Sequence, residues 1–139
     1  MKKENRLRKN MEFKKVYKSG KNYWNRNLIL FIKKNGDKNT RIGISITKKI
    51  GNAVVRNKLK RRIKSINEDY ITSIKSGYDI VIIPKKNAVE LTFKDLESAV
   101  KHIYKISGLL EKRWDNDTDS HCVNKILPKI YLKIYSYWE

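Results

Sequence analysis

The spacing of hydrophobic residues along this chain changes abruptly near its middle. Isoleucines occupy alternate positions from 42 to 46, which predicts a strand with one apolar face. After the Gly51-Asn52 break, apolar residues recur every three or four positions, at Val55, Leu59, Ile63, Ile66 and Tyr70. At roughly 100° per residue, these side chains fall within an arc of about 80°. The pattern therefore predicts a strand, a tight turn and an amphipathic helix over residues 53–73, with Asn52 as its N-cap.

An earlier segment predicts a short helix between Asn10 and Gly20. Asn10 is a suitable N-cap, Glu12 would interact favourably with the helix dipole, and Gly20 suits a left-handed C-terminal cap. Phe13 and Tyr17 are four residues apart and would stack along one face of this helix. Two interpretations stay open here: the rings belong to an ordinary core, or they form a stacking platform for unpaired bases.

A second apolar segment, residues 28–33, predicts a strand that Tyr23 and Trp24 would extend at its start. The turn signal Asn35-Gly36-Asp37 follows it directly. We therefore expect this strand and residues 41–48 to form an antiparallel hairpin with a loose loop.

A third apolar run, Ile80–Ile83, shows no alternation at all. A strand of this kind is buried on both faces and lies inside its sheet, and Pro84 would end it. Beyond it, Thr92 and Asp95 resemble a capping box for a last helix that stops before Gly108. We expect that helix to bury Phe93, Leu96, Val100 and Ile103.

The composition divides the chain into four segments. They are a basic flexible arm (1–9), one globular domain (10–112), an acidic linker (113–122) and an amphipathic extension (123–139). The extension could dock on the domain, on a partner or on a membrane surface, and the sequence does not choose among them. Alternating aspartates in the linker resemble the start of a calcium loop, but its sixth and twelfth positions lack the required glycine and glutamate, so we reject a calcium site.

Charge adds the strongest functional signal. The net charge is +19, and the segment from 41 to 64 holds nine basic residues and no acidic one. On the predicted helix, polar and cationic side chains occupy the side opposite the apolar stripe, at Arg56, Asn57, Lys60, Arg61 and Lys64. Self-repulsion of this size destabilises a compact state unless a polyanion compensates it, which favours nucleic-acid binding over a merely lysine-rich protein.

The residues available for chemistry are few. The single cysteine, Cys122, excludes an internal disulfide and a cysteine-based zinc site and fits a reducing compartment. No signal peptide or membrane span is apparent, so we expect a cytoplasmic protein. The two histidines, His102 and His121, are far apart, and the acidic residues are scattered. The chain therefore supplies charge and stacking surfaces but no evident catalytic group.

Three consecutive motifs in the basic segment resemble the protein subunit of bacterial ribonuclease P. They are the strand Arg41–Lys49 (RIGISITKK), the turn Gly51–Val54 (GNAV) and the helix start Arg56–Arg61 (RNKLKR). Lys58 departs from the family pattern, which usually has arginine, and it lacks the planar fork needed for bidentate phosphate contact. The resemblance covers residues 5–108.

The resemblance implies an α/β (α+β) two-layer sandwich. Its mixed four-stranded sheet would follow the element order αβββαβα, with a left-handed crossover at the basic helix. It also implies a role: the RNA subunit of a ribonucleoprotein, with magnesium, cleaves precursor tRNA, while the protein binds that RNA and the 5′ leader. No catalytic residue or small-molecule substrate of the protein itself is implied. The protein would also help to bind the metal ions, through ligands that the sequence does not identify.

The resemblance further implies two groups of site residues. Those expected to face the catalytic RNA are Lys48, Lys49, Arg56, Asn57, Lys58, Lys60, Arg61 and Lys64. Those expected to line the leader cleft are Phe13, Tyr17, Phe31 and Ser45. Two other functions stay open beside this one: a purely structural RNA binder and a protein-only nuclease.

Overall fold

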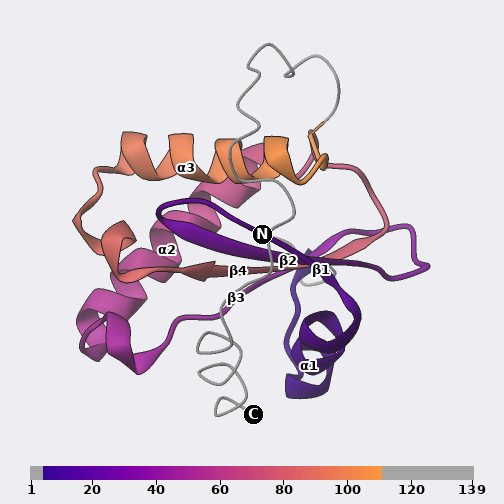
Figure 1. Cartoon of the computed structure of the whole chain (residues 1–139), viewed down its shortest axis with the longest axis horizontal. Helices are drawn as coiled ribbons and strands as arrows, with labels where there is room; N and C mark the ends of the chain where they lie inside the picture. The colour runs from indigo at the N-terminus through magenta and orange to yellow at the C-terminus, as the bar shows by residue number, and fades with distance from the viewer. Residues whose placement is uncertain (1–4, 111–139) are drawn as a thin grey trace.

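A mixed four-stranded sheet with helices on both faces forms the described part of the chain (Figure 1). The computed structural model describes residues 5–110. In chain order the elements are α1 (Asn10–Ser19), β1 (Lys21–Trp24), β2 (Leu28–Lys34), β3 (Arg41–Ile44), the 3₁₀ turn η2 (Lys48–Ile50), α2 (Ala53–Tyr70), β4 (Tyr78–Pro84), the 3₁₀ turn η3 (Lys86–Glu90) and α3 (Phe93–Ile106). The helices and strands therefore follow the order αβββαβα, which confirms the α+β class with a mixed sheet.

The strand order, β1-β2-β4-β3, corrects one prediction. β2 and β3 do not form a hairpin, because β4 lies between them, antiparallel to β2 and parallel to β3. The predicted turn does form at Gly36, whose φ is +71°. A turn signal is local, however, whereas β4 is apolar on both sides and is best buried with a neighbour along each edge. Tyr23 and Trp24 also differ from expectation, since they belong to the separate strand β1, antiparallel to β2.

The connection from β3 through α2 to β4 joins two parallel neighbouring strands. The left hand of this crossover stays a prediction of the family resemblance. The site does not depend on the hand of the crossover, because β3 is the edge strand of the sheet and α2 follows it in the chain after the 3₁₀ turn η2.

The two faces of the sheet carry two separate apolar clusters. In Figure 1, α2 and α3 lie on one side of the sheet and α1 on the other. Ile80 and Ile82 of β4 belong to the larger cluster beneath α2 and α3, and Val81 and Ile83 belong to the smaller cluster beneath α1. All four side chains are fully buried, which confirms the prediction of a strand buried on both faces.

The apolar stripes of α2 and α3 pack largely as predicted. Leu59, Ile63 and Ile66 of α2 and Leu96, Val100 and Ile103 of α3 are buried in the larger cluster. Phe93 is the exception, with 41% of its surface exposed. It is the first residue of α3, where the chain enters the helix, so its position in the apolar period does not bring it into the core.

The ends of α2 and α3 are capped as predicted, although α2 is shorter. The Asn52 side chain accepts a hydrogen bond from the backbone N–H of Val55 (3.0 Å), and the Thr92 hydroxyl accepts one from Asp95 N–H (3.2 Å). α2 ends at Tyr70 instead of continuing to residue 73.

The ends of α1 correct two predictions. Lys9, not Asn10, is the N-cap, and Asn10 is the first residue of the helix. Gly20 has an extended conformation (φ −82°, ψ 162°), so it is not a left-handed cap. Glycine is needed there for space: a Cβ would lie 2.4 Å from the Val16 carbonyl oxygen and 2.6 Å from that of Ile32.

Residues 5–9, predicted to belong to a flexible arm, instead run beside β3. Leu7 N–H donates to the Ile42 carbonyl (3.2 Å), and Asn5 Nδ2 donates to the Thr40 carbonyl (3.1 Å). Leu7 is buried, which anchors the segment. The predicted linker (113–122) and extension (123–139) lie outside the described residues, as does the predicted end of the domain at residue 112.

Candidate nucleic-acid interface

A groove follows the edge strand β3 between α1 and α2. It consists of two neighbouring cavities, of about 190 Å³ and about 390 Å³. Phe13 of α1, Ile44 of β3 and Lys60 of α2 line both cavities, so the two are adjacent. We call this surface the α1–α2 groove; its other polar and aromatic lining residues are Arg6, Arg8, Asn10, Tyr17, Ser45 and Lys64.

The smaller cavity forms an aromatic end of the groove. Phe13 and Tyr17 are half-buried, with ring centroids 6.5 Å apart and ring planes tilted by 47°. Ser45 also lines this cavity, although only 9% of its surface is exposed. Three of the four residues expected in a leader cleft therefore lie together at this end of the groove.

Phe31 does not line the groove and differs in this respect from the other three. Only 1% of its surface is exposed, because α1 packs over this part of β2. Its ring lies 5.1 Å from the ring of Tyr17, edge to face, at an interplanar angle of 77°. Phe31 is therefore too buried to contact a ligand directly, and it packs against the ring of Tyr17 instead.

The larger cavity forms a cationic end. Arg6, Arg8, Lys60 and Lys64 line it together. The sequence indicated Lys60 and Lys64, which are four residues apart on α2, but it did not single out Arg6 and Arg8. The available signal was Leu7, an apolar residue within a basic segment, which anchors the two arginines beside β3.

The outer face of α2 is a second cationic surface. Asn57, Lys58 and Arg61 are exposed, and Arg56 is half-exposed. Exposed Lys48 and Lys49 of η2 continue this surface before the N-terminus of α2. Within residues 5–110, no ion pair joins an acidic side chain to Arg56, Lys58, Lys60 or Arg61. The charge predicted for this helix is therefore available to an external anion.

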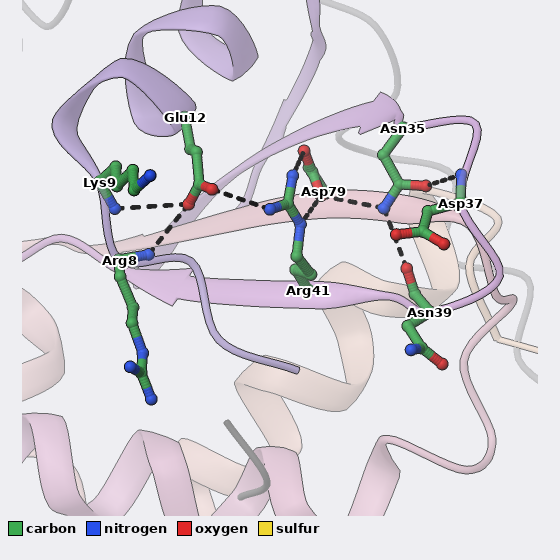
Figure 2. Close-up of polar contacts among 8 residues, drawn as sticks. All are labelled: Arg8, Lys9, Glu12, Asn35, Asp37, Asn39, Arg41 and Asp79. Atoms are coloured by element: carbon green, nitrogen blue, oxygen red, sulfur yellow. Dashed lines mark hydrogen bonds and ion pairs between the residues drawn. The ribbon is translucent and has the colours of Figure 1, made fainter. Parts of the chain in front are cut away.

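Arg41 differs from the α2 cations named above because it is paired with acidic side chains, as Figure 2 shows. Its Nη2 and Nε atoms lie 2.8 and 2.9 Å from the two carboxylate oxygens of Asp79, and its Nη1 lies 2.9 Å from Glu12 Oε1. These contacts join α1, β3 and β4. Arg41 is thus neutralised within the protein and does not belong to the anion-binding surface.

The ionisation of this cluster follows from its contacts. The hydrogen bond from Arg41 to Asp79 raises the pKa of the Arg41 guanidinium and outweighs the cost of partial burial. Burial by itself would raise the pKa of Glu12, but backbone N–H groups of Arg8 and Lys9 and the Arg41 guanidinium together lower the pKa of Glu12. Arg41 and Glu12 are therefore both charged at neutral pH.

The acidic side chains and histidines of the described region are dispersed or already engaged. Across residues 5–110, no three His, Cys, Asp or Glu side chains are grouped closely enough to bind an ion. Glu12 and Asp79 are both engaged by Arg41, and His102 contacts the side chain of Asn25 (3.3 Å). No helix within the described residues has the length and apolarity needed to span a membrane.

An α+β domain with an aromatic and cationic groove beside a basic helix has the features of a protein that binds single-stranded and folded nucleic acid. Comparison with known proteins defines the family. The family model Ribonuclease P matches residues 1–107. The chain belongs to the ribonuclease P protein family.

Curated relatives and solved structures agree with this assignment. The ribonuclease P protein component of Finegoldia magna is 52% identical over 103 residues, which cover 74% of this chain and 90% of the relative. That of Clostridium botulinum (strain Langeland) is 44% identical over 108 residues, covering 77% and 97%. The RNase P protein of Staphylococcus aureus, solved at 2.0 Å, superimposes with a TM-score of 0.72 at 32% identity, covering 77% of this chain and 98% of that one. The Thermotoga maritima protein gives 0.66 at 33%, covering 70% and 92%.

Proposed function

We propose that this chain is the RNA-binding protein subunit of a ribonuclease P ribonucleoprotein in the cytoplasm. In this particle an RNA subunit, with magnesium, hydrolyses precursor tRNA at its 5′ side. Family membership supports the tRNA-processing role. The observation that carries the assignment of roles is the α1–α2 groove, which combines aromatic rings at one end with lysine and arginine side chains at the other.

We assign the 5′ leader to this groove. Unpaired nucleotides bind where aromatic rings offer stacking surfaces and cations follow the backbone. Phe13 and Tyr17 would stack on leader bases, and Lys60 would contact the adjoining phosphate. Lys60 and Lys64, expected from the resemblance to face the catalytic RNA, are assigned to the leader here because they line the groove.

We assign the RNA subunit to the outer face of α2 and to η2. Folded RNA presents phosphates and 2′-hydroxyl groups along a helical surface, which suits a row of exposed cations. The residues with this role are Lys48, Lys49, Arg56, Asn57, Lys58 and Arg61. No ion pair within the described region competes with such contacts at Arg56, Lys58 or Arg61.

Magnesium and the chemical step are assigned to the RNA subunit. The carboxylates nearest the groove, Glu12 and Asp79, are bound by Arg41, so they do not fit a magnesium site of the protein's own. This chain would bind and orient the substrate, and its contribution would be seen in affinity for precursor tRNA.

A reconstitution experiment tests the proposal against its two rivals. Cleavage of precursor tRNA is measured with the purified protein, with the RNA subunit, and with both. We expect no cleavage by the protein alone and stronger binding of precursor tRNA when both are present. Cleavage by the protein alone would establish a protein-only nuclease. An RNA activity and substrate affinity that the protein leaves unchanged would favour a purely structural RNA binder.

A further inference from the structure

The ring of Phe13 stands at the junction of the aromatic and cationic ends of the groove, because it lines both cavities. A single strand that stacks at one end and places phosphates at the other must pass this ring. The position of Phe13 therefore decides whether the two ends act as one binding track. Two contacts between α1 and β3 fix that position.

The first contact is the ring of Phe13 against the backbone of Gly43. A Cβ at position 43 would lie 2.5 Å from Phe13 Cζ and 2.6 Å from Phe13 Cε1. Real Cβ atoms do not approach other atoms so closely, so any residue other than glycine would displace the ring. Gly43 is paired in register with Val81 in the parallel ladder between β3 and β4. Because it has no side chain, it leaves room for the Phe13 ring.

The second contact is the ion pair from Arg41 to Glu12. Arg41 precedes Gly43 by two residues on β3, so both project toward the same face of the sheet. Glu12 directly precedes Phe13, and its other carboxylate oxygen accepts backbone hydrogen bonds from Arg8 (3.1 Å) and Lys9 (3.3 Å). Figure 2 shows how Asp79 holds Arg41 from the opposite side. The first turn of α1 is thus tied to β3 and, through Asp79, to β4.

We propose that Arg41, Glu12 and Gly43 are positioning residues that set the Phe13 ring at the junction of the groove. Gly43 provides the space for the ring, and the Asp79–Arg41–Glu12 chain prevents α1 from sliding or rotating away from it. Arg41 acts through Phe13 and not through phosphate, since its charge is satisfied internally. The proposed consequence for leader binding rests on the assignment of the leader to this groove; the positioning of the ring does not.

The positioning itself is tested by NMR on the free protein. The Gly43 Hα proton that occupies the Cβ position points at the Phe13 ring, so we expect the Gly43 Hα resonances to show ring-current shifts that disappear in Phe13→Leu. Glu12→Gln should reduce these shifts, because it weakens the pairing with Arg41 while keeping an acceptor at the α1 N-terminus. Glu90→Gln, an exposed position on η3, makes the same charge change and should leave them unaltered. Shifts that Glu12→Gln leaves at the wild-type value would overturn the role of the ion pair.

The consequence for binding is tested with the reconstituted ribonucleoprotein. The measured quantity is the affinity for precursor tRNA divided by that for mature tRNA. Phe13→Leu, Gly43→Ala and Glu12→Gln should each lower this ratio, Gly43→Ala by about threefold or more. In a Phe13→Leu background, Gly43→Ala should lower the ratio much less, because the methyl group then keeps only its weaker 3.0 Å approach to Leu7 Cβ.

The outcomes separate the two proposals. A ratio lowered by Phe13→Leu but unaffected by both Gly43→Ala and Glu12→Gln would overturn the positioning inference and leave leader binding in place. The inference would also fail if Gly43→Ala lowered the ratio equally with and without the Phe13 ring. A ratio unchanged by Phe13→Leu would instead overturn the assignment of the leader to this groove.

Discussion

Tyr104 of α3 donates a buried hydrogen bond to the side-chain oxygen of Asn67 of α2. Both side chains are fully buried, and burial raises the pKa of the Tyr104 hydroxyl far above its ordinary value, so it remains a neutral donor. Asn67 Nδ2 has no hydrogen-bond partner within residues 5–110. This bond is the buried one of two side-chain hydrogen bonds described between α3 and α2, the helix that carries the cationic surface; the other joins Tyr70 to Glu97.

We expect Tyr104→Phe to lower the free energy of unfolding by about 1–3 kcal/mol, because it leaves the buried Asn67 oxygen without a donor. Urea denaturation followed by circular dichroism measures the change. Replacing both groups, in Tyr104→Phe with Asn67→Leu, should recover much of the loss, since no unpaired polar atom then remains. A single variant as stable as the wild type would show that the bond contributes little.

Arg61→Ala should weaken assembly with the RNA subunit while leaving the fold unchanged. Arg61 is exposed, and no ion pair within the described region occupies it. Losing one phosphate contact should reduce the slope of log K against log salt concentration by about 0.7–0.9. Lys94→Ala, at an exposed position of α3, is the matched control and should leave the slope unaltered. A wild-type slope for Arg61→Ala would place this side chain outside the RNA interface.

Tyr17→Ala should weaken binding of precursor tRNA by roughly 1–3 kcal/mol, the range for loss of one stacking ring. Binding of mature tRNA should not change, because it has no leader. Tyr17→Phe keeps the ring and its edge contact with Phe31, so it should bind nearly as the wild type does. Equal losses for both tRNAs would indicate a damaged core beneath α1.

The Glu12–Arg41 ion pair should make part of the stability depend on pH. The folded protein lowers the pKa of Glu12 from its ordinary 4.5, so the pair stabilises fully above that pH and the contribution is lost as the pH falls through the folded value. We expect Glu12→Gln to cost roughly 0.5–1 kcal/mol at pH 7 and progressively less below pH 4.5. Denaturation curves from pH 3 to pH 7 measure this difference, with Glu90→Gln as the control. A cost that does not vary with pH would contradict it.

Local sequence patterns correctly predicted those features of the fold that depend on residues close together in the chain. The caps of Asn52 and Thr92 and the buried stripe of α2 are set by residues within one or two turns. The absence of alternation in β4 even predicted its place inside the sheet. The predicted hairpin was wrong because a turn signal specifies a local reversal but not the partner of each strand.

The two site residues that differed most from expectation show the same limit. Phe31 lies in an unbroken apolar run, residues 28–32, which indicates a strand buried on both faces but not that α1 would be the element covering Phe31. In the sequence, Arg41 is one of nine basic residues between positions 41 and 64. In the structure it is neutralised by Glu12 and Asp79, which are 29 and 38 residues away in sequence. A contact over such separations leaves no periodic trace in the sequence.

The sequence by itself determined that one helix would be apolar on one side and cationic on the other, because side-chain direction on a helix follows from spacing alone. Only the tertiary structure decided which cations remain available. It brought Arg6 and Arg8 beside Lys60 and Lys64, and it removed Arg41 from that set through Asp79 and Glu12. Charge is fixed residue by residue, but its neutralisation depends on distances that arise only when separate elements pack together.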